Sequence, residues 1–173
     1  MKLSFSCGRP FPLGEVMSTP TQEQISQAQE LAQKLLAEKQ KLTALAYQST
    51  GKTPGDIKEL NSFINASGQF ALASAFIHSW IFSNPTLNFD NGVKLDFRAD
   101  VWGLGLGGGV IWLAGSMASP EELLGEVSFA FQTNPVHTEL AFWKDGRAVG
   151  VLVGIGLNIQ VGAFGGTGTF KKV

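Results

Sequence analysis

The chain has little of what most catalytic and metal-binding sites are built from. Its 173 residues include one cysteine, Cys7, and two histidines, His78 and His137. A single cysteine excludes an intrachain disulfide and a zinc site made of cysteines, and two isolated histidines make a poor metal site. We therefore expect no metal, no cofactor and no catalytic constellation, and we predict that the protein is not an enzyme.

Charges and long apolar runs are scarce as well. Only 16% of the residues are charged and the formal net charge is -1, so nucleic acid is not an expected partner. No stretch reaches the roughly 18 uninterrupted apolar residues that a membrane-spanning helix needs. The N-terminus lacks the apolar core of a conventional signal peptide. We expect a soluble protein that is cytoplasmic or is exported by an unconventional route.

What the chain has in excess is glycine in its second half. Fifteen of the 21 glycines lie between Gly103 and Gly168, interleaved with Val, Ile, Leu, Phe and Trp. Glycine weakens a strand unless the backbone must bend sharply or another backbone must come close. A chain that accepts glycine so often is predicted to form a small, strongly curved antiparallel β-barrel.

The first half has a helical period, which makes the predicted class α+β. We predict an irregular arm over 1–17, a helical segment over 18–68 and a β-barrel domain over 69–173. Thr19 as cap, Pro20 at the first position and Gln22 as the capping-box partner predict a helix over 20–49 that stops at Gly51. This helix has one apolar stripe, which consists of Ile25, Ala28, Ala32, Leu35, Leu36, Leu42 and Leu45. The stripe fits a helix packed on its own domain or the seam of a self-associating coiled coil.

The same cap-and-proline pattern at Thr53-Pro54 predicts a second helix that ends near Gly68, with Phe63 and Ile64 on its apolar side. From Gln69 the period changes to two. Residues 69–83 are predicted to form a strand, with a buried helix as the alternative, because apolar runs rich in alanine are ambiguous.

Two turn sequences stand out in the β half. Asn91-Gly92 and Asp145-Gly146 predict tight hairpins, and residues 119–124 predict a short helix between strands. Similar sequences recur 51 to 54 residues apart, as in Leu87-Asn-Phe89 and Leu140-Ala-Phe142. We predict about eight strands, arranged in two similar four-strand units. The alternative is that the recurring sequences reflect a chance similarity among glycine-rich segments.

Aromatic and charged residues of the β half suggest the surfaces to examine. Asp96 and Asp100 share a strand face with Arg98 between them, which favours a solvated, mutually neutralising face over paired acid/base chemistry. Four tryptophans are candidates for contact with a ligand or a membrane: Trp80, Trp102, Trp112, Trp143.

The second half resembles the Vap (virulence-associated protein) family of intracellular rhodococcal pathogens over about residues 69–170. The stretches concerned run from Leu95-Asp-Phe97 through 103–109 to Trp112, and from Leu140 through Gly146 to Gly154-Ile-Gly156. The resemblance implies a compact eight-stranded barrel without an enzymatic site, acting on host endolysosomal membranes through lipid contact. The N-terminus departs from the family pattern of a secretion signal followed by a disordered tail.

Two functions follow as hypotheses. The first is a non-enzymatic bacterial effector or toxin that acts at a lipid membrane or host protein surface. The second is a barrel that binds a small hydrophobic ligand inside, which requires a cavity where the aromatic residues otherwise pack together. Self-association through the N-terminal helix is a further expectation.

Overall fold

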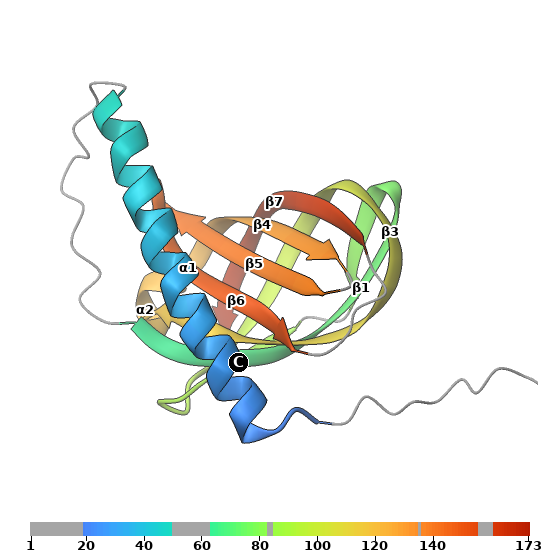
Figure 1. Ribbon diagram of the computed structural model, residues 1–173, viewed down its shortest axis with the longest axis horizontal. Helices are drawn as coiled ribbons and strands as arrows, with labels where there is room; N and C mark the ends of the chain where they lie inside the picture. Colours follow the sequence, from blue (N-terminus) through green and yellow to red (C-terminus); the bar gives the residue numbers. More distant parts are fainter. Residues whose placement is uncertain (1–18, 50–62, 83–84, 135, 156–160) are drawn as a thin grey trace, which may run out of the picture.

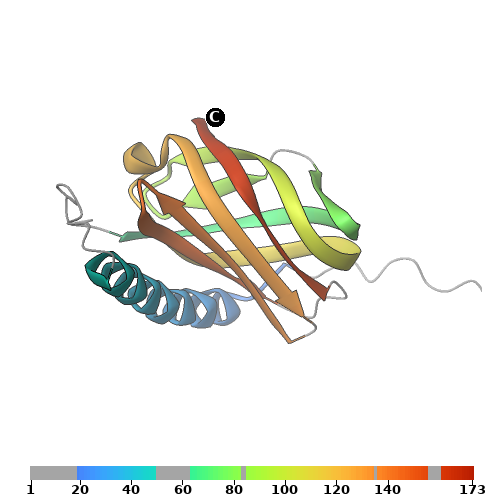
Figure 2. The ribbon, with the colours of Figure 1, turned by 90° about the horizontal axis from the view of Figure 1, so that it is seen from above.

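A computed structural model describes residues 19–49, 63–82, 85–134, 136–155 and 161–173; for 46–49, 71–82, 102, 104 and 106–109 it describes the backbone alone. One long helix lies outside a closed barrel of strands (Figures 1 and 2). The elements, in chain order, are α1 (Gln22–Ser49), β1 (Phe63–Phe82), β2 (Thr86–Phe89), β3 (Lys94–Ala118), α2 (Pro120–Leu123), β4 (Gly125–Asn134), β5 (His137–Lys144), β6 (Arg147–Ile155) and β7 (Val161–Lys172).

α1 begins with a capping box, but the predicted residues are wrong by two positions: Thr21 and Gln24 form the box, and Pro20 lies before the helix. The Gln24 backbone N–H donates to Thr21 Oγ1 at 3.2 Å, and the Thr21 N–H donates back to Gln24 Oε1 at 2.9 Å. Both Thr19 and Thr21 are followed three residues later by glutamine, so the sequence allows either box. The predicted stop at Gly51 and the residues 53–62 of the predicted second helix lie outside the described residues.

The barrel closes because β3 takes part in it twice. Residues 95–106 of β3 pair with β7, and residues 112–117 pair with β6. On its other edge β3 pairs with β2 and with β1. The ring therefore runs from the first half of β3 through β2, the start of β1, the second half of β3, β6, β5, β4 and β7, back to the first half of β3. This gives eight antiparallel strand segments, and β3 reverses direction in its glycine-rich middle.

The ring order confirms the two four-strand units. The first unit supplies β1, β2 and both halves of β3, and the second supplies β4, β5, β6 and β7 in the same relative order. Both predicted hairpin turns are present, between β2 and β3 and between β5 and β6. Gly92 has φ 84, and Asp145 and Gly146 have φ 51 and 75, the left-handed values that such tight turns require.

The predicted strand over 69–83 is confirmed, but it begins earlier than expected. β1 starts at Phe63, so residues 63–68 are strand and not the end of a second helix. Their pairing partners decide this, because Phe63 to Gly68 lie opposite Ala118 to Leu113 in the ladder with β3. Tertiary pairing overrides a spacing of apolar residues that also fits a helix.

The interior of the barrel is packed with aromatic side chains. Phe97 is fully buried, and its ring centroid lies 5.5 Å from Phe129, 5.3 Å from Phe142 and 4.8 Å from Phe170. Phe131 stacks on Phe164 further along the barrel, with centroids 6.0 Å apart. The described interior is thus a solid core, as is usual for small barrels.

Helix α1 covers the outer face of β3, β6 and β5 with small side chains. Ala28, Ala32 and Leu36 are buried there against alanines and valines of the sheet. Small residues on both sides allow the helix to lie close to the strands, as the side view shows (Figure 2). The helix therefore packs on its own domain, as predicted.

One ion pair fastens the helix to the barrel. Lys39 Nζ lies 2.6 Å from Glu139 Oε1, and the side chains are 26% and 12% exposed. The same ammonium lies 5.8 Å from the centroid of the Trp143 ring. Without Lys39, the buried Glu139 carboxylate would lose its nearest cation, and this loss is costly for a group with little access to water.

We expect Lys39→Met to loosen α1 without unfolding the barrel. Amide hydrogen exchange in α1 should speed up about tenfold, which corresponds to about 1.4 kcal/mol, while exchange in β4 to β6 stays unchanged. Lys34→Met is the matched control, because Lys34 is exposed on the same helix. Equal exchange in the two variants would show that the ion pair does not hold the helix.

Candidate functional site

The two ends of the barrel differ in charge. One end carries the β2–β3 turn, α2, the β5–β6 turn and the last residues of β7, and it holds Asp90, Lys94, Glu121, Glu122, Lys144, Asp145, Arg147, Lys171 and Lys172. We call this the charged end. The opposite end carries the β4–β5 turn, the end of β6 and the start of β7. It also carries the bend of the two-stranded ribbon that β1 and β3 form together, where residues 70–76 pair with 105–111. We call this the uncharged end.

The uncharged end presents apolar side chains to solvent. Val136 is 88% exposed, Val161 52% and Val110 38%. The pairing of Thr133 with Gly162 brings the turn that holds Val136 near Val161, and the pairing of Leu106 with Val161 places Val161 beside the strand segment that carries Val110. The paired ribbon segments 70–76 and 105–111 contain no Asp, Glu, Lys or Arg. In Figure 1 this end lies on the right, where the arrows of β4 and β6 end.

The β4–β5 turn holds Val136 in its exposed position. Asn134 Oδ1 accepts hydrogen bonds from the backbone N–H groups of Val136, at 3.0 Å, and His137, at 2.9 Å. An asparagine side chain that binds the backbone two and three residues ahead fixes the turn without a partner from elsewhere. The exposed valine is thus positioned by local chemistry.

Titratable groups near the uncharged end are few. Glu139 lies toward it, but its carboxylate is paired with Lys39, and its second oxygen lies 3.7 Å from His137 Nε2. Among the residues whose side chains are described, no cluster of three His, Cys, Asp or Glu could hold a metal. The side chain of His78 and all of Cys7 lie outside the described part.

The four candidate tryptophans are spread around the barrel rather than gathered. Trp112 is half-buried at the edge of the uncharged end, opposite Gln69 and Ile155. Its indole Nε1 is buried and has no hydrogen-bond partner among the described residues. Trp143 is half-buried near the charged end, beneath Lys39. Trp80 and Trp102 lie on the returning part of the β1–β3 ribbon, and their side chains are outside the described part.

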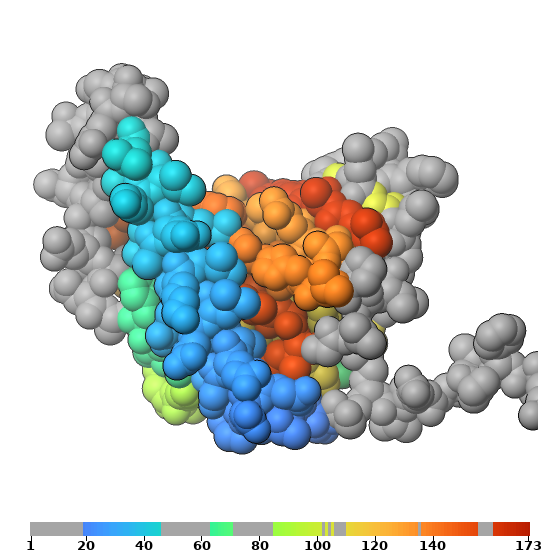
Figure 3. Space-filling view, in the orientation of Figure 1, coloured from blue at the N-terminus to red at the C-terminus, as the bar shows by residue number. Residues whose placement is uncertain are grey.

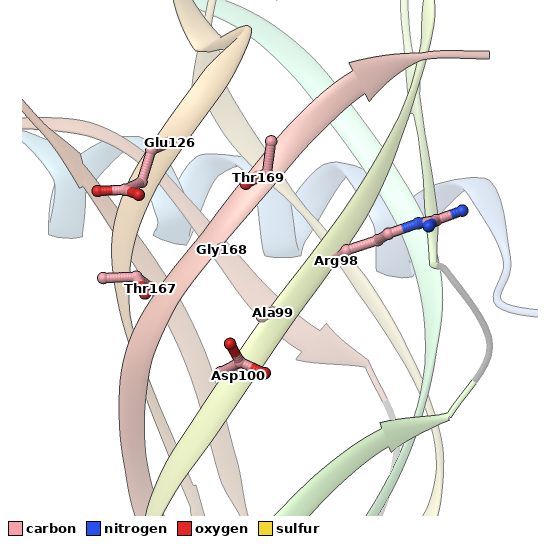
Figure 4. Close-up of a pocket in the computed structure, with 7 residues that line it drawn as sticks. All are labelled: Arg98, Ala99, Asp100, Glu126, Thr167, Gly168 and Thr169. Atoms are coloured by element: carbon pink, nitrogen blue, oxygen red, sulfur yellow. The ribbon is translucent and has the colours of Figure 1, made fainter.

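A polar hollow of about 300 Å³ lies on the wall of the barrel, over β3, β7 and β4. Ladder pairing sets Arg98 opposite Thr169 and Asp100 opposite Thr167, with Glu126 on the far side of β7. In Figure 4 the Arg98 side chain points away from Asp100. Among the described residues Arg98 forms no ion pair with either aspartate, and both Arg98 and Asp100 are exposed to solvent.

The remaining member of that face is held separately. Asp96 Oδ1 accepts a hydrogen bond from Thr86 Oγ1 at 2.7 Å across the β2–β3 ladder. The hollow is open, since the side chains of Arg98, Asp100, Glu126 and Thr167 are exposed.

The sequence alone did not point us to the uncharged end, although it contains a signal for it. Charged residues of the β half come in short clusters, at 90–100, 121–126, 139–147 and 171–172. Between them lie long stretches without Asp, Glu, Lys or Arg, such as 101–120 and 148–170. In an antiparallel barrel, where successive strands run in opposite directions, this alternation predicts one charged and one uncharged end.

Neither helix in the described part is long and apolar enough to cross a bilayer.

No curated protein matches the chain. Among solved structures, the chain is similar to virulence-associated protein VapB from Rhodococcus equi, with 19% identity over 65% of this chain and 98% of that one and a TM-score of 0.47. It is also similar to VapD from the same organism, with 20% identity over 64% and 97% and a TM-score of 0.48.

The comparison with family models covers more of the chain. The model described as the Rhodococcus equi virulence-associated protein matches residues 17–171. This span includes all of α1 and almost all of the barrel. The chain therefore belongs to the family of Rhodococcus equi virulence-associated proteins.

Proposed function

We propose that this protein acts without catalysis, as a virulence effector, at a lipid membrane surface that it contacts through the uncharged end of the barrel. The observation that carries the proposal is the exposure of Val110, Val136 and Val161 at an end whose strand segments lack Asp, Glu, Lys and Arg. Apolar side chains at a rim without charges gain free energy when they enter the boundary between headgroups and acyl chains.

The other candidate, an internal site for a hydrophobic ligand, has less support. A drug-sized ligand needs a cavity of roughly 300 Å³ or more. Here the centre of the barrel is occupied by Phe97 and the rings around it, and both ends of this cluster continue into buried leucines and phenylalanines. The outer surface is therefore the better place to look for function.

The lipid proposal predicts binding that depends on apolar contact and little on charge. We expect the protein to float with zwitterionic vesicles about as well as with anionic ones, and salt to have little effect, because screening acts on charged contacts. Strong binding to anionic vesicles alone, abolished by salt, would point to the charged end instead. The absence of flotation with any vesicle would refute a lipid role and leave a host protein surface as the partner to test.

Substitution at the uncharged end locates the contact. We expect Val136→Asp combined with Val161→Asp to lower the vesicle partition coefficient roughly tenfold or more, because a carboxylate opposes entry into the apolar layer. The matched control is Val173→Asp, the same change at a 75% exposed valine of the charged end. All three sites are at least half exposed, so the thermal unfolding midpoints should stay close together.

A further inference from the structure

Helix α1 carries a second apolar stripe that the barrel does not cover. Leu42 is 65% exposed, Leu45 50% and Leu31 40%. The sequence predicted Leu42 and Leu45 on the apolar stripe, whereas Leu31 was not part of that prediction. Leu35 lies between them and is half-buried, because part of its side chain packs against the cluster that joins α1 to the barrel. The four leucines follow one another at intervals of four, seven and three along the helix. We call Leu31, Leu35, Leu42 and Leu45 the leucine stripe.

The leucine stripe and the barrel-facing residues lie on different sides of the helix. At about 100° per residue, the stripe is centred about a quarter turn away from Ala28, Ala32 and Leu36, which contact the sheet. Figure 3 shows α1 as a ridge across the face of the barrel, with its outward side uncovered. The stripe is therefore available to a partner without moving the helix from the barrel.

We propose that the leucine stripe binds the same stripe of a second copy of this chain, with the two helices antiparallel. The intervals of three, four and seven residues place Leu35 and Leu42 at one core position of a heptad and Leu31, Glu38 and Leu45 at the other. In an antiparallel pair these positions alternate across the seam. Leu31 then lies opposite Leu42 of the second copy, and Leu35 opposite its Glu38.

The charges of α1 favour the antiparallel direction. Glu30, Lys34, Glu38 and Lys41 are all exposed, and none forms an ion pair within the described residues. In the antiparallel register Glu30 comes within a turn of Lys41 of the second copy, and Lys34 within a turn of Glu38. A parallel pair would place Glu38 opposite itself in the seam, where like charges are destabilising.

The same charges argue for a second copy over a lipid surface. The four exposed groups beside the stripe are two carboxylates and two ammonium groups, so this face has no cationic excess to attract anionic lipid. A copy of the same helix instead supplies an opposite charge for each of them. The pairing does not depend on the proposed contact of the uncharged end with lipid.

Sedimentation analysis of the full chain tests the association. We expect a monomer that converts to a dimer as the concentration rises, and Leu42→Glu should raise the dissociation constant at least about tenfold. Gln33→Glu, an equally exposed change on another side of α1, should leave it unchanged. A monomer at every concentration up to roughly 1 mM would overturn the proposal. So would loss of vesicle binding in Leu42→Glu without any change in mass.

Cysteine cross-linking tests the direction. In a Cys7→Ser background, mixing a Leu31→Cys chain with a Leu42→Cys chain should give the mixed disulfide as the main product on oxidation. Each variant alone should cross-link poorly. Efficient homodimers of the Leu31→Cys chain would show a parallel pair and would overturn the antiparallel assignment.

Discussion

Replacement of Phe97 by alanine should lower the free energy of unfolding by about 3–5 kcal/mol. Phe97 lies at the centre of the barrel, and its ring meets Phe129 and Phe142 edge to face, at interplanar angles of 87° and 88°. These rings come from β4 and β5, so one side chain on β3 joins both four-strand units. The loss combines the transfer of the buried ring with the cavity left behind, and urea unfolding measures it.

The same substitution decides between a packed core and a ligand cavity. Phe97→Leu serves as the graded control and should cost about 1–2 kcal/mol, because most of the volume remains. If Phe97→Ala changed stability by less than about 1 kcal/mol, the interior would not be close-packed, and an internal hydrophobic ligand would become the better hypothesis. Saturable binding of a hydrophobic fluorescent probe by the unaltered protein would point the same way.

Local chemistry made part of this fold predictable. The hairpins at Asn91-Gly92 and Asp145-Gly146 follow from residues that tolerate left-handed backbone angles, and the short helix α2 follows from Pro120 and two acids in its first turn. The repeated distances between similar segments predicted two units, and the strand order confirms them. These features depend on neighbours in sequence, so periodicity and turn residues are enough to find them.

Other features depend on contacts that sequence periodicity does not contain. Phe63 and Ile64 fit a helix by spacing, yet they pair with Ala118 and Met117 because the barrel needs a strand between β2 and the second half of β3. The apolar stripe of α1 reads as one band in the sequence, but only its first part meets the sheet, so Leu42 and Leu45 stay exposed. In both cases the deciding partner is far away along the chain.

The candidate site was harder to predict than the fold for a related reason. Aromatic composition drew attention to tryptophans, which the barrel distributes over its whole wall, from Trp112 at one end to Trp143 near the other. The uncharged end is instead defined by segments that lack charged residues and lie far apart in the sequence. Such an absence becomes visible only when the strand order shows which turns lie at the same end.

Replacement of Gly115 by alanine should cost about 3 kcal/mol or more, and it should disturb the joint between the two units. A Cβ at this position would overlap the carbonyl oxygen of Val151 and would lie 2.9 Å from both the Leu152 Cα and the Ala32 Cβ. Gly115 pairs with Leu152 in the β3–β6 ladder, and Ala32 belongs to α1. The added methyl thus forces apart β6 and the helix at the same point, and chemical denaturation gives the loss.

A second glycine and a compensating variant show which contact matters. Gly165→Ala places a Cβ 3.1 Å from the Phe129 carbonyl oxygen and near nothing else, so we expect a change within about 1 kcal/mol. Ala32→Gly removes the helix methyl but leaves the Val151 carbonyl, which is part of the backbone. Adding it to Gly115→Ala should therefore restore little stability. If the double variant recovered the full stability of the unaltered protein, the packing of α1, and not the β3–β6 ladder, would be what requires a glycine at residue 115. If Gly115→Ala were as stable as Gly165→Ala, neither the helix nor the ladder would require it.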